Sequence, residues 1–366
     1  MTTDIADNYR SFSGRLMGVD AARGLSVIGM TMVHVGPNSA EGLGGAIYGF
    51  PHGRASVLFV LVAGIGAALL SRTDERRWDA RLRLFWIAAL FLLIGLGLQS
   101  LDHGVAVILQ HYTAFYLLAL LLIPASPSLL FGLGIATALV GPIAYFVLRR
   151  LLSDVVERET VGWGDGLGDV LAGLVLTGPY PVLVWGAIVI WGMWIGRQKL
   201  TYASVQWILI ASGIVVAISA EAISWLALGQ YGRPDDSTDW RNLLIADGHS
   251  QMPLWLISSI GSATALVGIG LAIGRRWPSA IWPLAALGQV ALTYYIAHLV
   301  ALHFLEDRLR FSDVRHAAPS AMMLAVLGIG FAIAWRRYLR RGPVEWIMAR
   351  PFDRHRRREA SQNPRP

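Results

Sequence analysis

Long stretches without a charged residue constrain the fold of this chain more than any other feature. Runs free of Asp, Glu, Lys and Arg occur at 24–40, 55–71, 84–101, 104–148, 170–196, 200–220, 248–274, 277–305 and 317–335. A membrane-spanning helix needs about 20 mostly apolar residues. The run 104–148 is long enough for two helices, and Pro124 and Pro127 divide it. The pattern predicts an all-α polytopic membrane protein with about ten transmembrane helices, near 20–36, 55–71, 84–101, 104–124, 128–148, 178–196, 203–228, 252–274, 281–304 and 319–336.

The distribution of basic residues predicts the orientation of these helices. With the N-terminus in the cytoplasm, the inner segments hold 22 Lys and Arg residues and the outer segments hold 9. Cytoplasmic loops of membrane proteins are enriched in these residues. We therefore expect both termini inside and the longer loops 37–54, 149–177 and 229–251 outside, with room there for re-entrant or short interfacial helices.

The composition agrees with one multi-pass domain and excludes several classes of site. Hydrophobic residues make up 55% of the 366 residues, and 15% are charged, against about 25% in soluble domains. There is no cysteine, which excludes disulfides and thiolate chemistry. The net charge of +7 follows the predicted topology, so no nucleic-acid partner is predicted. We expect a single domain over 1–366 in the cell (inner or plasma) membrane, without a cleavable signal peptide. Residues 1–18 form a cytoplasmic segment and 337–366 a basic cytoplasmic tail.

The first predicted helix carries two ionisable residues, Arg23 and His34. Eleven helical steps make close to three turns, so both side chains lie on one face, roughly 16 Å apart along the axis. Ionisable groups inside a membrane usually mark function. The plainer interpretation of Arg23 is a residue that fixes orientation or pairs with Asp20, and that of His34 is a structural histidine bonded to a neighbouring helix. A histidine at this depth can otherwise act as a general base.

Other polar residues gather on the predicted outer side. His52, His103, His111 and His249 all lie toward that half, and Arg54 next to His52 could orient an anionic acceptor or stabilise an oxyanion. His298 lies inside the ninth predicted helix, and Glu221 inside the seventh. We interpret Glu221 as a hydrogen-bonded or protonated packing residue, and the alternative is a place on a proton path. No pair of histidines has the helical spacing of a zinc site, so no metal is predicted.

The Arg-x10-His pattern resembles the motif of acyltransferase-3 membrane enzymes. The wider chain is closer to the heparan-α-glucosaminide N-acetyltransferase-like and YeiB-like branch of the transmembrane acyltransferase superfamily. The matching pieces, in order, are Val19 to Gly24, His52 to Phe59 with Ala63-Gly64, Tyr180-Pro181 to Trp185 with Gly192 and Gly196-Arg197, Gly248-His249-Ser250, Leu284 to Gly288 with Ala291 to Thr293, and Arg341 to Trp346. They cover nearly the whole chain.

The resemblance implies an enzyme of about ten helices that moves an acyl group, usually acetyl, from cytoplasmic acyl-CoA to a sugar hydroxyl or amine across the membrane. Arg23 and His34 match the acyltransferase-3 pair. The heparan enzyme has an asparagine where His34 stands and an active histidine in the following outer loop. His52 is the histidine of that loop here, so both His34 and His52 are candidate catalytic residues.

Arginine suits phosphate, so Arg23, Arg76 and Arg77 are predicted to bind the phosphates of CoA from the cytoplasmic side. Arg54, His111, His249 and Ser250 are predicted to bind the acceptor. His34 either deprotonates the acceptor or takes the acyl group itself. The expected partners are the lipid bilayer, acyl-CoA (acetyl-CoA first) as donor substrate and a saccharide or glycolipid acceptor, and a homodimer stays open. The alternative is a transporter or flippase of a lipid-linked glycan or another anionic substrate, with the histidines as a proton relay.

Overall fold

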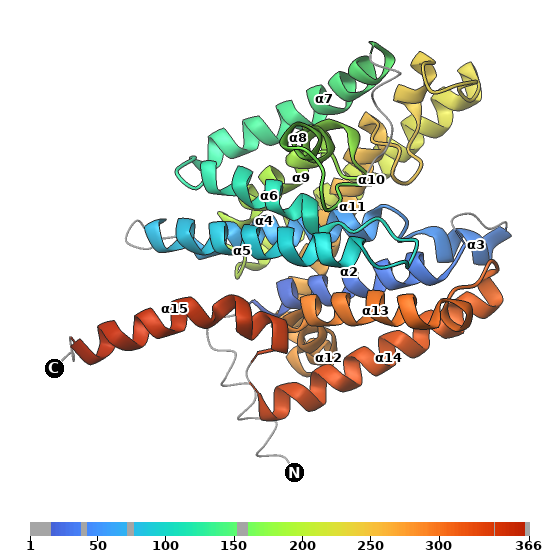
Figure 1. Ribbon diagram of the computed structural model, residues 1–366. Helices are drawn as coiled ribbons and strands as arrows, with labels where there is room; N and C mark the ends of the chain where they lie inside the picture. The colour runs from blue at the N-terminus through green and yellow to red at the C-terminus, as the bar shows by residue number, and fades with distance from the viewer. Residues whose placement is uncertain (1–15, 38–41, 72–76, 152–159, 340, 363–366) are drawn as a thin grey trace.

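The structure is a bundle of helices, seen here in a computed structural model that describes residues 16–37, 42–71, 77–151, 160–339 and 341–362 (Figure 1). The side chains of Arg77 and of residues 353–362 are not described. The long helices are α2 (Met17–Val35), α4 (Arg54–Leu70), α5 (Arg77–Gln99), α6 (Leu109–Leu121), α7 (Pro127–Leu151), α9 (Val182–Gly196), α10 (Ala203–Tyr231), α11 (Pro253–Arg276), α12 (Pro278–Gln289), α13 (Ala291–Leu309), α14 (Val314–Tyr338) and α15 (Pro343–Gln362). The short elements are α3 (Gly42–Gly49), α8 (Leu167–Ala172), the π-helix η2 (Gly173–Thr177) and the 3₁₀ helix η3 (Trp240–Leu244). No strand occurs in these ranges.

The apolar helices indicate a multi-pass membrane protein. Within the described residues, six helices are long and apolar enough to cross a membrane, and the number rises to eight if each of two bent helix pairs is one span. The predicted total of ten spans and the side on which the termini lie stay predictions. The central helix α2 is not among the six and carries Asp20 and Arg23 in its first turns.

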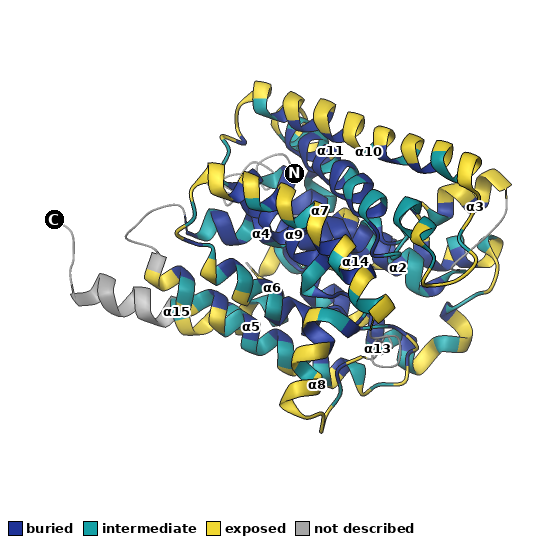
Figure 2. Ribbon diagram, turned by 90° about the horizontal axis from the view of Figure 1, so that it is seen from above, coloured by how far each residue is buried: buried dark blue, intermediate teal, exposed yellow. Residues whose placement is uncertain are grey.

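The core lies where α2, α4, α9 and α11 pack together, whereas α10 lies at the periphery. Figure 2 shows α4 and α9 in the buried interior and a row of exposed residues along α10. The exposed side chains of α10 are large and apolar, among them Trp207, Ile218 and Trp225. Such a surface suits contact with the hydrocarbon tails of lipids.

The centre of the bundle depends on close backbone contact between α2 and α12. A Cβ atom on Gly288 would overlap the backbone oxygen of Asp20, and one on Gly24 would overlap the backbone oxygen of Leu284. Small residues let helix backbones approach in this way in membranes. This contact fixes the first turns of α2, and therefore Asp20 and Arg23, against the end of α12.

The structure changes three of the predicted elements. The fourth predicted helix, 104–124, begins only at Leu109, because the loop before it is folded around Gln99 and His103, whose side chains accept the backbone N–H groups of Val107 and Val105. The ninth, 281–304, is broken at Val290 into α12 and α13, bent by 65°. The tail predicted as a basic segment contains α15.

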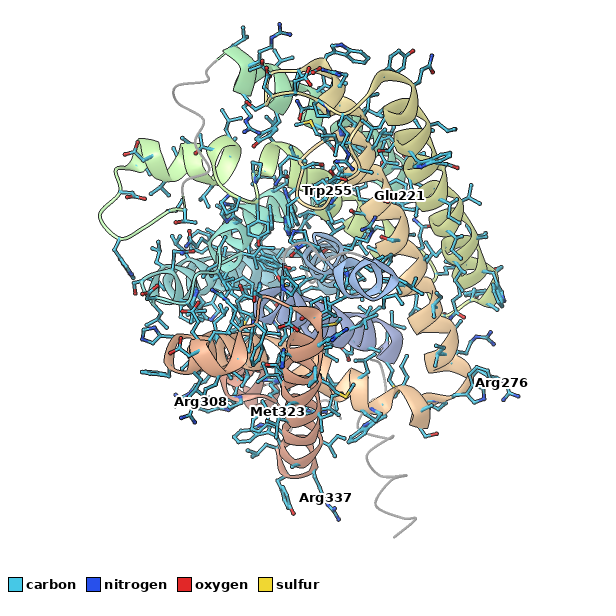
Figure 3. The ribbon with its side chains drawn as sticks, turned by 90° about the vertical axis from the view of Figure 1, so that its right-hand side faces the viewer. Glu221, Trp255, Arg276, Arg308, Met323 and Arg337 are labelled. Carbon is cyan, nitrogen blue, oxygen red and sulfur yellow. The ribbon has the colours of Figure 1, made fainter. Side chains whose placement is uncertain are left out.

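Other expectations are confirmed. The break predicted at Pro124 and Pro127 separates α6 from α7, which begins at Pro127, a position where proline suits a helix. Short helices do occur in the three predicted outer loops, namely α3, α8 with η2, and η3. Figure 3 shows Arg276 and Arg337 at the ends of α11 and α14, pointing away from the bundle, in segments that the sequence places in the cytoplasm.

Candidate functional site: polar cavities at opposite ends of α2

One cavity, here called the histidine cavity, lies at the C-terminal end of α2. Its volume is about 320 Å³. It brings together three of the predicted site residues, His34, His52 and His249, from segments far apart in the sequence. Its other lining residues are Met30, Val33, Gly36, Gly53, Ser56, Gly104, Val105, Ala106, Tyr180 and Arg310. Among the described residues, no group of three or more His, Cys, Asp or Glu side chains is arranged to hold a metal ion.

His34 is held by a second histidine from α13. Its Nδ1 lies 2.9 Å from Nε2 of His298, and the two rings are nearly parallel, at 8°. Nδ1 of His298 lies 3.3 Å from the backbone oxygen of Tyr294. The Tyr294 hydroxyl lies 3.1 Å from the Thr31 hydroxyl, which donates to the Val27 carbonyl. These contacts fix the His34 ring on α2 with respect to α13.

Arg310 closes the cavity from the loop after α13. Its guanidinium donates to the backbone oxygens of His34 (3.3 Å) and His103 (2.7 Å) and forms an ion pair with Glu306. Burial lowers the pKa of His103, which lies outside the spanning segments. The neutral ring of His103 donates from Nε2 to the Leu98 carbonyl and accepts the Val105 N–H at Nδ1. Arg310 therefore connects the end of α2 and the loop before α6 to the end of α13.

His52 and His249 face each other across the other side of the cavity. Their rings meet edge to face, with centroids 5.3 Å apart. His249 also packs on Tyr180 and Trp185. Its backbone is left-handed, with φ of 58°, and Gln251 has φ of 67°. Non-glycine residues in this region are strained and cluster at functional sites.

Gln251 stabilises this strained segment. It is fully buried, accepts a hydrogen bond from the Trp185 indole at 2.7 Å and donates to the Pro179 carbonyl at 2.9 Å. The loop before α11 is thereby tied to the loop before α9. Gln251 could not be selected from sequence patterns, because its role depends on two residues about seventy positions away.

The other predicted acceptor-binding residues lie outside the lining of the histidine cavity. Arg54 forms an ion pair with Glu221 of α10, and Glu221 also accepts from Ser258 at 2.6 Å. These contacts join α10 to α4 and α11, as a hydrogen-bonded packing residue would. His111 is fully buried behind Tyr180, with ring centroids 5.4 Å apart. The Ser250 hydroxyl accepts from the Met252 N–H at 3.4 Å.

Two further cavities, here called the arginine cavities, lie at the N-terminal end of α2 and share Arg23 and Arg83. The smaller, of about 240 Å³, is enclosed by α4, α5, α6, α13 and α15 and also contains Arg341 and Glu345. The larger, of about 1270 Å³, extends to Arg197 and Lys199 after α9. Arg23 was predicted to bind phosphate. Of the other two residues predicted for this role, Arg76 lies outside the described residues and Arg77 is the first residue of α5.

Carboxylates hold the polar groups of this end in place. Arg23 pairs with Asp20 at 3.2 Å, as the spacing suggested, and Asp20 also accepts from Gln289 at 3.0 Å. Glu345 on α15 accepts the backbone N–H groups of Leu292 (2.9 Å) and Thr293 (3.1 Å) and the Thr293 hydroxyl (2.6 Å). It caps the first turn of α13, where the helix dipole favours a negative charge. The break between α12 and α13 is therefore stabilised by the C-terminal helix.

Aromatic rings connect the two ends of the molecule. Phe59 lines the smaller arginine cavity and packs on Tyr112 and Tyr295, with centroids 5.3 and 6.4 Å away. Tyr295 packs edge to face on His298 at 5.1 Å, and His298 contacts His34. Phe59, Tyr295 and His298 thus form a chain of contacts that runs from the smaller arginine cavity, which contains Arg23, to His34.

This arrangement defines a multi-pass helical membrane protein with an ionisable cavity at each end of its central helix. Residues 195–351 match a family described as "Protein of unknown function (DUF418)". The chain is also similar to the uncharacterized protein YeiB of Escherichia coli strain K12, with 25% identity over 396 residues, 91% of this chain and 95% of YeiB. These two findings support the YeiB-like relationship predicted from the sequence. The wider relationship to acyltransferases stays a prediction.

Proposed function

We propose that the protein is a membrane-bound acyltransferase that moves an acyl group, acetyl first, from cytoplasmic acyl-CoA to a hydroxyl or amine of an extracytoplasmic sugar or envelope glycan. The observation that carries the proposal is the placement of Arg23 and His34 in separate cavities at opposite ends of one helix. A donor with several phosphates and an acceptor on the other side of a membrane require such a pair of sites.

The arginine cavities suit the donor. Arg23, Arg83 and Arg341 surround the smaller one, and arginine matches the geometry of phosphate. Its inner wall is apolar, with Phe59, Ile87 and Phe91 among the lining residues. The buried hydroxyl of Tyr112 also faces this cavity, and no described residue bonds to it. Buried polar atoms are rarely left without a partner, so a polar group of a bound ligand would satisfy it.

The histidine cavity suits the transfer step. The acceptor oxygen or nitrogen attacks the thioester carbonyl carbon, and its proton passes to Nε2 of His34. The C–S bond then breaks, and the thiolate of CoA takes that proton back from the imidazolium. His52 and His249 lie across the cavity, where they would contact the acceptor. The thioester has to pass Phe59 and Tyr295, so these rings must rotate aside during turnover.

The proposal is tested with purified protein in liposomes, labelled acetyl-CoA and a panel of envelope glycans, followed by mass analysis of the glycans. We expect CoA release coupled to an acetylated product. His34→Ala should abolish both, whereas His316→Ala, at an exposed histidine that pairs with Asp313, should leave them unchanged. Wild-type protein that binds acyl-CoA but never acylates any acceptor contradicts the proposal.

One observation favours the alternative, a transporter of an anionic substrate. The bend of 65° between α12 and α13 resembles the broken helices that form binding sites in transporters. The same liposomes distinguish the two functions. A transporter moves its substrate across the bilayer without consuming acyl-CoA, and His34→Ala then stops movement rather than acylation.

A further inference from the structure

We propose that His298 is a positioning residue that fixes His34 in the tautomer with a proton on Nδ1 and a lone pair on Nε2, directed toward the histidine cavity. The catalytic consequence rests on the acyltransferase function proposed above. The tautomer itself rests on the hydrogen-bonding contacts alone.

The assignment starts at the Tyr294 carbonyl. A carbonyl oxygen can only accept a hydrogen bond, so the contact of 3.3 Å places the proton of His298 on Nδ1. A neutral imidazole has one donor and one acceptor nitrogen. Nε2 of His298 is therefore an acceptor, and the contact of 2.9 Å requires His34 to donate from Nδ1.

The geometry of the two rings agrees with this direction of donation. A ring N–H and a ring lone pair both lie in the plane of the imidazole, and the rings of His34 and His298 are within 8° of parallel. With Nδ1 occupied, the lone pair of His34 is on Nε2. That nitrogen has no protein hydrogen-bond partner among the described residues, and His34 lines the cavity.

The surrounding contacts hold the pair in register. Thr31, one turn before His34 on α2, bonds to Tyr294, one turn before His298 on α13. Arg310 holds the backbone oxygen of His34. The two helices are therefore connected on both sides of the histidine pair, which leaves the His34 ring little freedom to flip.

A histidine differs from a carboxylate in this orienting role. Among the residues that the structure describes, no Asp or Glu lines the histidine cavity, so none of these supplies a negative charge beside the imidazolium that forms when His34 takes a proton. Nε2 of His298 stabilises it instead as a neutral acceptor, and the hydrogen bond between the rings becomes charge-assisted at that moment. His298 therefore orients the His34 ring without placing a charge of its own beside it.

The test combines spectroscopy with kinetics on the full-length protein labelled with ¹⁵N-histidine. Long-range ¹H–¹⁵N correlation spectra distinguish a protonated ring nitrogen from a bare one, and His34→Gln assigns the signals of His34. We expect His34 and His298 both to carry their proton on Nδ1. A proton on Nε2 of His34 in the wild-type protein overturns the proposal.

Variants of His298 add a second measurement. His298→Leu removes the acceptor, and we expect the His34 signals to become an average of two tautomers. Turnover should then fall about ten- to a hundredfold, as when an outer-shell partner of a histidine is lost, with KM for acyl-CoA unchanged. His298→Gln retains an acceptor near the position of Nε2. It should therefore keep most of the single-tautomer signal of His34 and most of the turnover. His303→Leu on the same helix is the control. Unchanged His34 signals in His298→Leu also overturn the proposal.

The two proposals can fail separately. A wild-type spectrum with the expected tautomers in a protein that transfers no acyl group retains the inference about His298 and rejects the acyltransferase function. If His298→Leu does not fold, the wild-type spectrum and His298→Gln still decide the matter.

Discussion

The two ends of α2 are built on the same helix but use different chemistry. At the N-terminal end, arginines share the cavities with carboxylates, and Asp20 and Glu345 hold the charged groups and the broken helix in place. At the C-terminal end, no carboxylate within the described ranges lines the histidine cavity, and its titratable lining groups there are three histidines, Tyr180 and Arg310. Permanent positive charge suits the binding of phosphate, whereas neutral imidazole suits proton transfer. The comparison teaches that one helix separates two chemically different environments, which in the proposed function would be a phosphate-binding end and a proton-transferring end.

The largest effect is expected in a test of the side of the membrane on which each end of α2 lies, because a single cysteine is either labelled or not labelled. The chain has no cysteine, so single cysteines at Ser237 and Ser279, both exposed, report topology without background. We expect an impermeant thiol reagent on intact cells to label Ser237→Cys and not Ser279→Cys, and both after the membrane is made permeable. Labelling of Ser279→Cys alone in intact cells would reverse the assignment of the two cavities.

The next largest effect is expected at the proton-transferring end. His34→Ala should lower acyl transfer by about 10²–10⁴-fold, the usual contribution of a general base, while acyl-CoA still binds. His52→Ala should weaken use of the acceptor more than hydrolysis of the donor. Single-turnover assays with separate binding measurements check both. If His52→Ala abolishes turnover and His34→Ala does not, the roles of the two histidines are exchanged.

A smaller effect is expected at the phosphate-binding end. Arg23→Gln should weaken acyl-CoA binding by roughly ten- to a hundredfold, because a charged hydrogen bond contributes about 1.5–3 kcal/mol. Calorimetry on the folded variant measures this, with Arg233→Gln as a control at an exposed arginine that lines none of the three cavities. Unchanged affinity would leave Arg23 with the role of a topology anchor paired with Asp20.

The broken helix gives a stability prediction. Glu345→Ala leaves the N–H groups of Leu292 and Thr293 without their acceptor, and an unsatisfied buried group costs about 1–3 kcal/mol. The thermal midpoint in detergent should fall, and Glu345→Gln, which retains an acceptor, should fall less. An identical midpoint for both variants and the wild type would show that the bend does not depend on α15.

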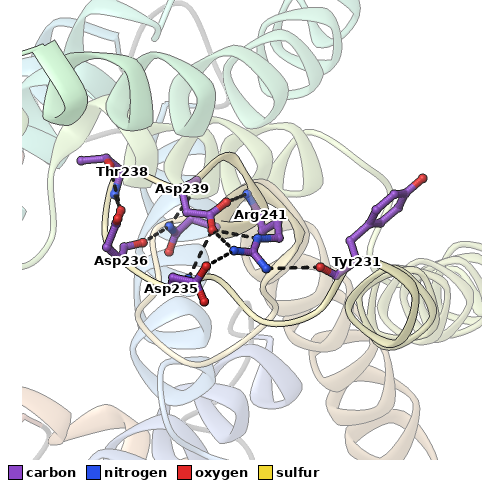
Figure 4. A network of polar contacts seen from close by, with 7 residues as sticks. Tyr231, Asp235, Asp236, Thr238, Asp239 and Arg241 are labelled. Atoms are coloured by element: carbon purple, nitrogen blue, oxygen red, sulfur yellow. Dashed lines mark hydrogen bonds and ion pairs between the residues drawn. The ribbon is translucent and has the colours of Figure 1, made fainter.

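The smallest effect is expected in the loop before α11. Arg241 donates to Asp239 and lies 2.5 Å from Asp235, as Figure 4 shows. The hydrogen bond from Arg241 lowers the pKa of Asp239 to about 2. A lowered folded-state pKa gives stability that is present above the unfolded value, near 3.9, and is lost as pH falls toward 2. The protection factors for hydrogen exchange over 235–245, which correct for the intrinsic pH dependence of exchange, should therefore fall between pH 4 and 2, and less so in Arg241→Gln, which has already lost the contact.

Sequence patterns predicted the helices well, because an uncharged run is a local property. The break at Val290 was not predictable in that way. The run 277–305 is continuous, and the carboxylate that caps the second half comes from Glu345, fifty residues later. The fourth helix was predicted too long for a similar reason, since the side chains of Gln99 and His103 hold the preceding loop.

The site was predictable only in part. Arg23, His34, His52 and His249 could be selected from the sequence because each is an ionisable residue in or next to an apolar run, and the structure places the three histidines in one cavity. Arg54 and Glu221 were selected separately, and only the fold shows that they pair with each other. Arg83, Arg310 and the role of His298 required tertiary contacts, because nothing in their local sequence distinguishes them from anchoring arginines or a packing histidine.

The placement of Arg23 and His34 on one helix has a thermodynamic consequence. A ligand that shifts or rotates α2 at one cavity changes the shape of the other, so the two binding equilibria are linked. Linkage is reciprocal: the factor by which a ligand in one cavity changes the affinity of the other cavity for its ligand is also the factor by which the second ligand changes the affinity for the first. The helix has 19 residues and is roughly 28 Å long. If it moves as a rigid body, a ligand bound at one end changes the binding affinity at the other end before any bond is broken.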